Sequence, residues 1–191
     1  MKNIIILFLL LYSTNAFAQT IWAKKIEGGG FSGPNIYELA NGNYLIKGVG
    51  IQEYDTNGNA VNHISYQDMI TYSMIKTNDG GYAFTGVGWT PNNEFSGAIL
   101  FKMNAEGDSL WTKAYGGDGI DRGYDLQQTA DGGYFIVGYT ESFYTEFGGN
   151  SIQQYAMYLI RTDEYGDTLW TKAHEYNPSG PPEFAYCVAK N

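Results

Sequence analysis

The chain is poor in the residues that build catalytic and metal centres. Its 191 residues include one cysteine, Cys187, and two histidines, His63 and His174. A single cysteine excludes an intramolecular disulfide framework, and we interpret Cys187 as a small buried hydrophobe in a strand. The histidines have no zinc-ligand spacing, and no nucleophile elbow, phosphate-binding loop or His-Glu-x-x-His run is present. The sequence therefore predicts no catalytic residue, no metal and no cofactor.

Positive charge is also scarce. Eleven Lys and Arg residues face 20 Asp and Glu residues, which gives a net charge of -9. Nucleic acids and anionic membrane surfaces attract proteins through basic patches. The composition therefore argues against both as partners.

Long apolar runs are missing beyond the first eighteen residues. That segment joins Lys2, an apolar run from Ile4 to Leu11 and the small-x-small end Ala16-Phe17-Ala18. A spanning helix needs roughly 20 apolar residues, whereas this order of regions is typical of a secretory signal peptide. We expect residues 1–18 to be a signal peptide, the protein to be exported without a membrane span, and residues 19–191 to form one domain.

The chain does contain a repeat. Asp-Gly-Gly-Tyr at 79–82 recurs at 131–134 and, as Asn-Gly-Asn-Tyr, at 41–44; Gly-Asp-Ser-Leu-Trp-Thr-Lys at 107–113 returns with one change at 166–172. Strand formers lie between these segments, separated by Gly and Asp turns. Each repeat thus holds four strand candidates, named a to d here in chain order. Four-stranded repeats of this length are typical of propeller blades.

We therefore predict an all-β fold of four-stranded antiparallel, propeller-like blades. About three blades plus partial strands would form an incomplete ring. The expected parts are a d-type strand at 20–26, blade 1 at about 35–66, blade 2 at about 69–115, blade 3 at about 122–174 and the start of blade 4 at about 183–191.

Two residue types receive a structural interpretation. Gly48, Gly86 and Gly138 fall inside b strands, where glycine marks a bulge or a close backbone approach. The tryptophans at equivalent d positions, Trp111 and Trp170 among them, are expected to pack between neighbouring blades.

The pattern resembles secreted bacterial β-propeller repeat proteins, of the kind found in bacteria with type IX secretion. The carriers are Asp-Gly-Gly-Tyr-x-x-x-Gly at 79–86 and 131–138 and the two tryptophan segments, and the resemblance covers residues 20–191. The first repeat departs, with Asn62 in place of Trp. The resemblance implies a propeller fold and an exported protein, and propellers host many functions.

The b–c segments lengthen along the chain while the other spans stay nearly constant. Insertions in repeats often build a binding surface, here on the face shared with the d–a connections. Both insertions, 89–97 and 141–155, are expected to be loops, the second between strands predicted at 134–139 and 156–162. They contain aromatic residues that suit sugar stacking or protein contacts. The predicted ligand-binding residues are Trp89, Asn92, Phe95, Phe143, Tyr144, Phe147 and Tyr155.

Acidic residues allow two further interpretations. Asp118, Asp121 and Asp125 offer oxygen ligands for calcium, but six to eight oxygens are required, and ordinary turn chemistry explains them better. The pairs Asp163–Glu164 and Glu141–Glu146 invite a glycosidase interpretation, although spacing in sequence does not place them.

Taken together, these patterns predict an exported, noncatalytic binding or structural module for protein or carbohydrate. The alternative is an extracellular polysaccharide hydrolase or lyase on a propeller scaffold. Because a d-type strand precedes blade 1 and an a-type strand, 184–190, follows blade 3, we expect the chain to be the N-terminal part of a longer propeller. A head-to-tail oligomer is the competing hypothesis, and open strand edges would favour self-association in either case.

Overall fold

The computed structural model describes residues 36–48, 50–64, 69–89, 96–147 and 150–175. The expected signal peptide, the d-type strand at 20–26 and the start of blade 4 lie outside the described residues. The described part is all-β, with twelve strands and no helix. It accordingly contains no helix that is long and apolar enough to cross a membrane.

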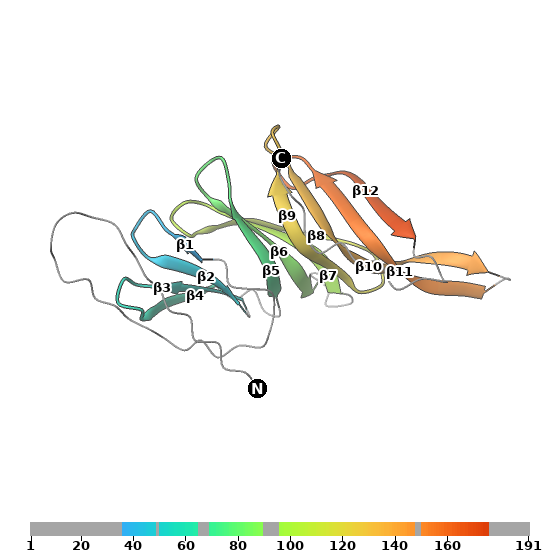
Figure 1. Ribbon diagram of the computed structural model, residues 1–191, viewed down its shortest axis with the longest axis horizontal. Coiled ribbons are helices and arrows are strands. Elements are labelled where there is room, and N and C mark those ends of the chain that lie inside the picture. Colours follow the sequence, from blue (N-terminus) through green and yellow to red (C-terminus); the bar gives the residue numbers. More distant parts are fainter. Residues whose placement is uncertain (1–35, 49, 65–68, 90–95, 148–149, 176–191) are drawn as a thin grey trace.

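The strands form three four-stranded antiparallel sheets, each in chain order. The first contains β1 (Ile36–Glu38), β2 (Tyr44–Gly48), β3 (Gly50–Tyr54) and β4 (Ala60–Ile64). The second contains β5 (Ile70–Lys76), β6 (Tyr82–Trp89), β7 (Ser96–Met103) and β8 (Ser109–Tyr115). The third contains β9 (Asp121–Gln128), β10 (Tyr134–Phe147), β11 (Asn150–Thr162) and β12 (Thr168–Glu175). The sheets follow one another across Figure 1 without closing a ring among the described residues, which confirms the predicted propeller-like fold.

The a–b turns of the second and third sheets have a shared construction. Gly80 and Gly132 have φ values of 84° and 89°, which a side chain with a Cβ rarely adopts. The preceding aspartates meet a cation on the c strand, with Lys102 Nζ 2.8 Å from Asp79 and Arg161 Nη2 2.5 Å from Asp131. Each pair therefore ties a turn to a strand of its own sheet.

In the first sheet the a–b turn is also tied to the c strand, but here the c-strand residue is an acid and the turn residues are amides. Glu53 occupies the c-strand position, and its Oε1 accepts hydrogen bonds from Asn41 Nδ2 at 3.2 Å and Asn43 Nδ2 at 2.6 Å. The two asparagines that depart from the repeat motif thus match the exchange of a cation for a carboxylate.

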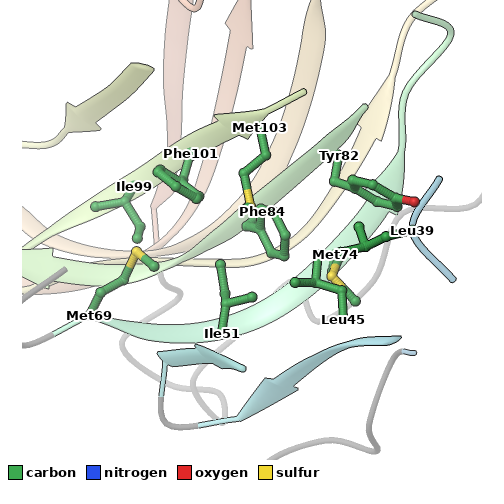
Figure 2. Close-up of a cluster of buried hydrophobic side chains, with 10 residues drawn as sticks. All are labelled: Leu39, Leu45, Ile51, Met69, Met74, Tyr82, Phe84, Ile99, Phe101 and Met103. Carbon is green, nitrogen blue, oxygen red and sulfur yellow. The ribbon is translucent and has the colours of Figure 1, made fainter. Parts of the chain in front are cut away.

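Two apolar cores lie between the sheets. Figure 2 shows the first core, to which the first and second sheets both contribute: Leu39, Leu45, Ile51, Met69, Met74, Tyr82, Phe84, Ile99, Phe101 and Met103. The second core joins the second and third sheets: Ala83, Ala98, Leu100, Tyr115, Leu126, Tyr134, Ile136, Tyr158 and Ile160. Because successive strand residues face opposite sides, β6 and β7 supply both cores.

The repeat tyrosines and Trp111 belong to these contacts between sheets. Tyr82 and Tyr134 are each 1% exposed, and the Tyr82 hydroxyl donates to the Glu38 carbonyl in the first sheet at 2.9 Å. Trp111 of the second sheet packs edge-on against Tyr134 of the third, with ring centroids 6.1 Å apart. Packing between blades is therefore confirmed for Trp111.

Trp170 differs from Trp111. It is 40% exposed and packs on Phe135 of its own sheet, with centroids 5.9 Å apart. The expected packing between blades is absent among the described residues, because no described sheet follows the third.

Glycines in β6 and β10 face a backbone bulge. The β9–β10 register shifts between Val137 and Gly138, and a Cβ on Gly138 would lie 1.9 Å from the Arg122 carbonyl oxygen. A Cβ on Gly86 would lie equally close to the Ile70 carbonyl. The close approach predicted for these two positions is confirmed; for Gly48 the structure gives backbone pairing with Gly50.

Replacing Gly138 by alanine should therefore destabilise the protein. We expect Gly138→Ala to lower the free energy of unfolding by about 3 kcal/mol, because backbone must move to admit the methyl group. Gly97→Ala is the matched control, since its nearest neighbour would be the Tyr115 carbonyl oxygen at 3.2 Å, and should cost about 1 kcal/mol or less. Urea denaturation measures both; equal losses would contradict the bulge explanation.

Candidate functional site

The longest insertion forms a projecting hairpin and not a loop. The sequence predicted strands ending at 139 and restarting at 156, but β10 and β11 stay paired to the Phe147–Asn150 position after a register shift between Thr140 and Phe143. Figure 1 shows this end extending past the other strands. The prediction of a loop over 141–155 was wrong because the insertion is itself rich in aromatic and other strand-forming residues. We call residues 143–154 the projecting hairpin.

The predicted ligand-binding residues lie at the b–c ends of two sheets, as far as they are described. Phe143 pairs with Gln154, Tyr144 with Gln153 and Phe147 with Asn150 along the projecting hairpin, while Tyr155 directly follows the projecting hairpin on β11. Trp89 ends β6, where it pairs with Ser96. These are backbone positions. Asn92 and Phe95 lie outside the described residues.

A hydrogen-bonded clasp holds the base of the projecting hairpin. The Ser142 hydroxyl donates to Asp121 Oδ2 at 2.6 Å and accepts from the Gly117 and Gly119 amides at 3.0 Å each. The Glu141 amide donates to the Ile120 carbonyl at 2.9 Å. The d–a connection 116–120 is thereby fixed against the start of the hairpin.

Glycine is required for this close approach. Gly116 has a φ of 135°, and a Cβ there would lie 1.9 Å from Asp121 Oδ2. A Cβ on Gly119 would lie 2.5 Å from the Glu141 carbonyl group. The Gly-Gly-Asp-Gly sequence thus lets the connection lie directly on the clasp.

Asp121 is the electrostatically costly member of the clasp. Its side chain is fully buried, and its Oδ1 has no hydrogen-bond partner among the described residues. Burial raises the pKa of Asp121, and the nearby Glu141 charge adds to this, against the lowering effect of hydrogen bonds from Ser142, Thr140 and Gly117. The protonated acid is therefore favoured in the folded protein relative to an exposed aspartate.

A second polar network links all three sheets through β2, β5 and β9. The Ser73 hydroxyl of β5 donates to Asp125 Oδ1 of β9 at 2.5 Å, and Lys47 Nζ of β2 donates to the Tyr72 carbonyl. Burial lowers the pKa of Lys47, while the charge of Asp125 acts in the opposite direction. The charges of Lys47 and Asp125 thus interact across the intervening second sheet.

The acidic residues considered from sequence have separate contacts. Asp118 is exposed, Asp121 is in the clasp, and Asp125 accepts from Ser73. No three His, Cys, Asp or Glu side chains gather as a metal site within the described ranges. Of the carboxylate pairs, Asp163 accepts the Tyr165 and Asp167 amides of its turn, and Glu141 accepts from the Tyr139 hydroxyl.

The sequence prediction missed Ser142 and Lys47. Ser142 lies near the start of the insertion 141–155, so no repeat periodicity marks it. Lys47 does have a signal, because it replaces the Thr85 of the second repeat at a strand position that faces a core. A lone cation at such a position requires a partner.

Comparison with family models and with curated proteins assigns no family to this chain. No protein-family model matches the chain, and no curated protein is similar enough to it to count as a relative. The function therefore has to be argued from the site.

The raised pKa of Asp121 predicts a pH dependence with a defined sign. The stabilisation is fully present below the usual pKa of 3.8 and is lost as pH rises through the higher folded-state value, because the folded protein holds the proton more tightly. Asp121→Asn cannot ionise. We expect the free energy of unfolding of this variant, relative to wild type, to increase with pH through that window.

Urea denaturation from pH 3 to pH 7 measures this difference. Asp118→Asn, an exposed acid on the same connection, is the matched control and should stay within about 0.5 kcal/mol of wild type. A difference for Asp121→Asn that is constant with pH would contradict a titrating clasp.

Proposed function

We propose that this protein is an exported, noncatalytic binding module that recognises a protein or carbohydrate with the b–c and d–a edge of its sheets. The observation that carries the proposal is the projecting hairpin. It extends beyond the three sheets and is attached at its base by the Asp121–Ser142 clasp. A paired and anchored hairpin loses less conformational freedom on binding than a free loop of equal length.

The composition of the projecting hairpin supports the same proposal. Phe143, Tyr144 and Phe147 lie on one strand, with Gln153 and Gln154 on the other and Tyr155 directly after them. Aromatic rings bury large areas against sugar faces or protein side chains, while amides supply the hydrogen bonds that orient a ligand. Export rests on the signal-peptide pattern of residues 1–18.

The buried acid gives no support to the hydrolase or lyase alternative. A glycosidase needs two carboxyl groups that reach the substrate, roughly 5 to 9.5 Å apart. Asp121, the acid with the raised pKa, is fully buried in the clasp and in this conformation faces protein. A binding role requires no such pair.

Screening the purified protein on a glycan array and against surface proteins of the producing cell would supply the ligand. Trp89→Ala combined with Tyr144→Ala should then weaken binding at least about tenfold, because aromatic anchors dominate interface energies. Calorimetry measures the affinity, and circular dichroism checks the fold.

Tyr165→Ala is the control for this experiment. Tyr165 is 64% exposed in the c–d turn, at the opposite end of β11 from the projecting hairpin, so its loss should leave the affinity unchanged. Unchanged affinity in the double variant, or equal loss in the control, would place the binding surface elsewhere.

A further inference from the structure

The third sheet has one face in the second core and a second face that we call the outer face. Cross-strand pairing places two rows on it, Phe135–Arg161–Trp170 and Val137–Leu159–Lys172. Trp170 is 40% exposed, and Phe135 and Leu159 are half-buried. The outer face thus presents four apolar residues of β10, β11 and β12 beside Arg161 and Lys172; of the four, Val137 is already buried, at 4% exposed.

The equivalent rows of the second sheet are covered. They are Ala83–Lys102–Trp111 and Thr85–Leu100–Lys113. Ala83 and Leu100 are both 0% exposed, because they pack in the second core with Leu126 of β9. An apolar residue from the first strand of the next sheet, which we call its inner strand, therefore completes this surface.

The first sheet follows the same rule. Leu45 and Ile51, at positions equivalent to Ala83 and Leu100, are 0% exposed. They share the first core with Met74 of β5, which is also 0% exposed. Met74 and Leu126 are thus equivalent: each lies on the first strand of its sheet and covers apolar residues of the preceding sheet.

The sequence contains a third copy of the segment that performs this task. Tyr72-Ser73-Met74-Ile75-Lys76-Thr77 and Tyr124-Asp125-Leu126-Gln127-Gln128-Thr129 are matched by Tyr186-Cys187-Val188-Ala189-Lys190-Asn191. Val188 has the position of Met74 and Leu126. The third copy lies outside the described residues.

We propose that residues 184–190 occupy the outer face of the third sheet as an inner strand, with Val188 in the role that Leu126 has in the second core. The connection between β12 and this segment is long enough for the proposed position. Eight residues, 176–183, connect β12 to the segment, against five, 116–120, between β8 and β9. A chain reaches about 3.3 Å per residue, so distance is not limiting.

The repeat also specifies the register. Ser73 and Asp125 hold equivalent positions in successive inner strands, and their side chains are hydrogen-bonded at 2.5 Å. Cys187 holds the next equivalent position, so its side chain should lie beside Asp125. Because Cys187 is the single cysteine of the chain, this contact can be trapped as a disulfide.

The test compares two single variants of the full chain in oxidised glutathione. Asp125→Cys should form an intramolecular disulfide with Cys187, seen as a monomer that migrates faster on a nonreducing gel and confirmed by peptide mass. Ser73→Cys, one sheet further away, is the matched control and should not. A disulfide between chains would show that a second copy occupies the face, and would overturn the proposal. Equal disulfide formation in both variants would also overturn it, as would the absence of a disulfide in a folded Asp125→Cys protein.

If circular dichroism shows that Asp125→Cys does not fold, the proposal is tested instead by the reaction rate of the native Cys187 thiol. Leu159→Asp places a charge on the outer face and should speed the reaction of Cys187 with a thiol reagent about tenfold, because docking protects a thiol until the segment opens. Leu110→Asp is the control, since Leu110 is already 53% exposed on β8. Equal rates in the two variants would overturn the proposal.

Discussion

The architecture depends on the burial of sheet faces by neighbouring sheets, and the second sheet is covered in this way on both of its faces. A four-stranded sheet of this repeat is apolar on both sides in its b and c strands: β7 has Phe101 in the first core and Leu100 in the second. One sheet alone would leave both surfaces in water, and hydrophobic burial at about 25 cal/mol per Å² is the main term that favours stacking. The stability of each repeat therefore resides largely in its contacts with the next.

Polar contacts then decide how the stacked sheets are aligned. An apolar interface tolerates sliding, whereas a buried hydrogen bond is lost when its partner moves. Tyr82 reaches the Glu38 carbonyl of the preceding sheet, and the Tyr115 hydroxyl donates to the Gly166 carbonyl of the following one at 2.8 Å. Lys47, Ser73 and Asp125 add a contact series that runs through all three sheets. These hydrogen bonds and charges therefore fix the alignment of neighbouring sheets, which the apolar cores alone do not determine.

Local features were predictable from sequence, and contacts between distant residues were not. Asp-Gly-Gly turns, the alternation of strand residues and the glycines at 86 and 138 follow from backbone geometry within one hairpin, so the fold and the bulges could be predicted. The projecting hairpin was misjudged because an insertion interrupts the period on which strand assignment relied. Ser142 and Asp121 are 21 residues apart, and their contact depends on a connection whose course is set by tertiary packing. The aromatic residues 143, 144 and 147 were identified from composition, which does not reveal the paired hairpin that carries them or the clasp at its base.

The turn-to-strand pairs have a consequence for how such a chain can change. Asp79–Lys102, Asp131–Arg161 and the Asn41–Glu53–Asn43 group each lie within one sheet, so a whole repeat can be duplicated or exchanged between genes without breaking them. Lys47 and Asp125, by contrast, occur once each and lie in sheets that are not neighbours. Recombination that reorders the repeats would separate the buried Lys47 from the half-buried Asp125, which has the opposite charge, and selection would then preserve the order of the sheets more strictly than their number.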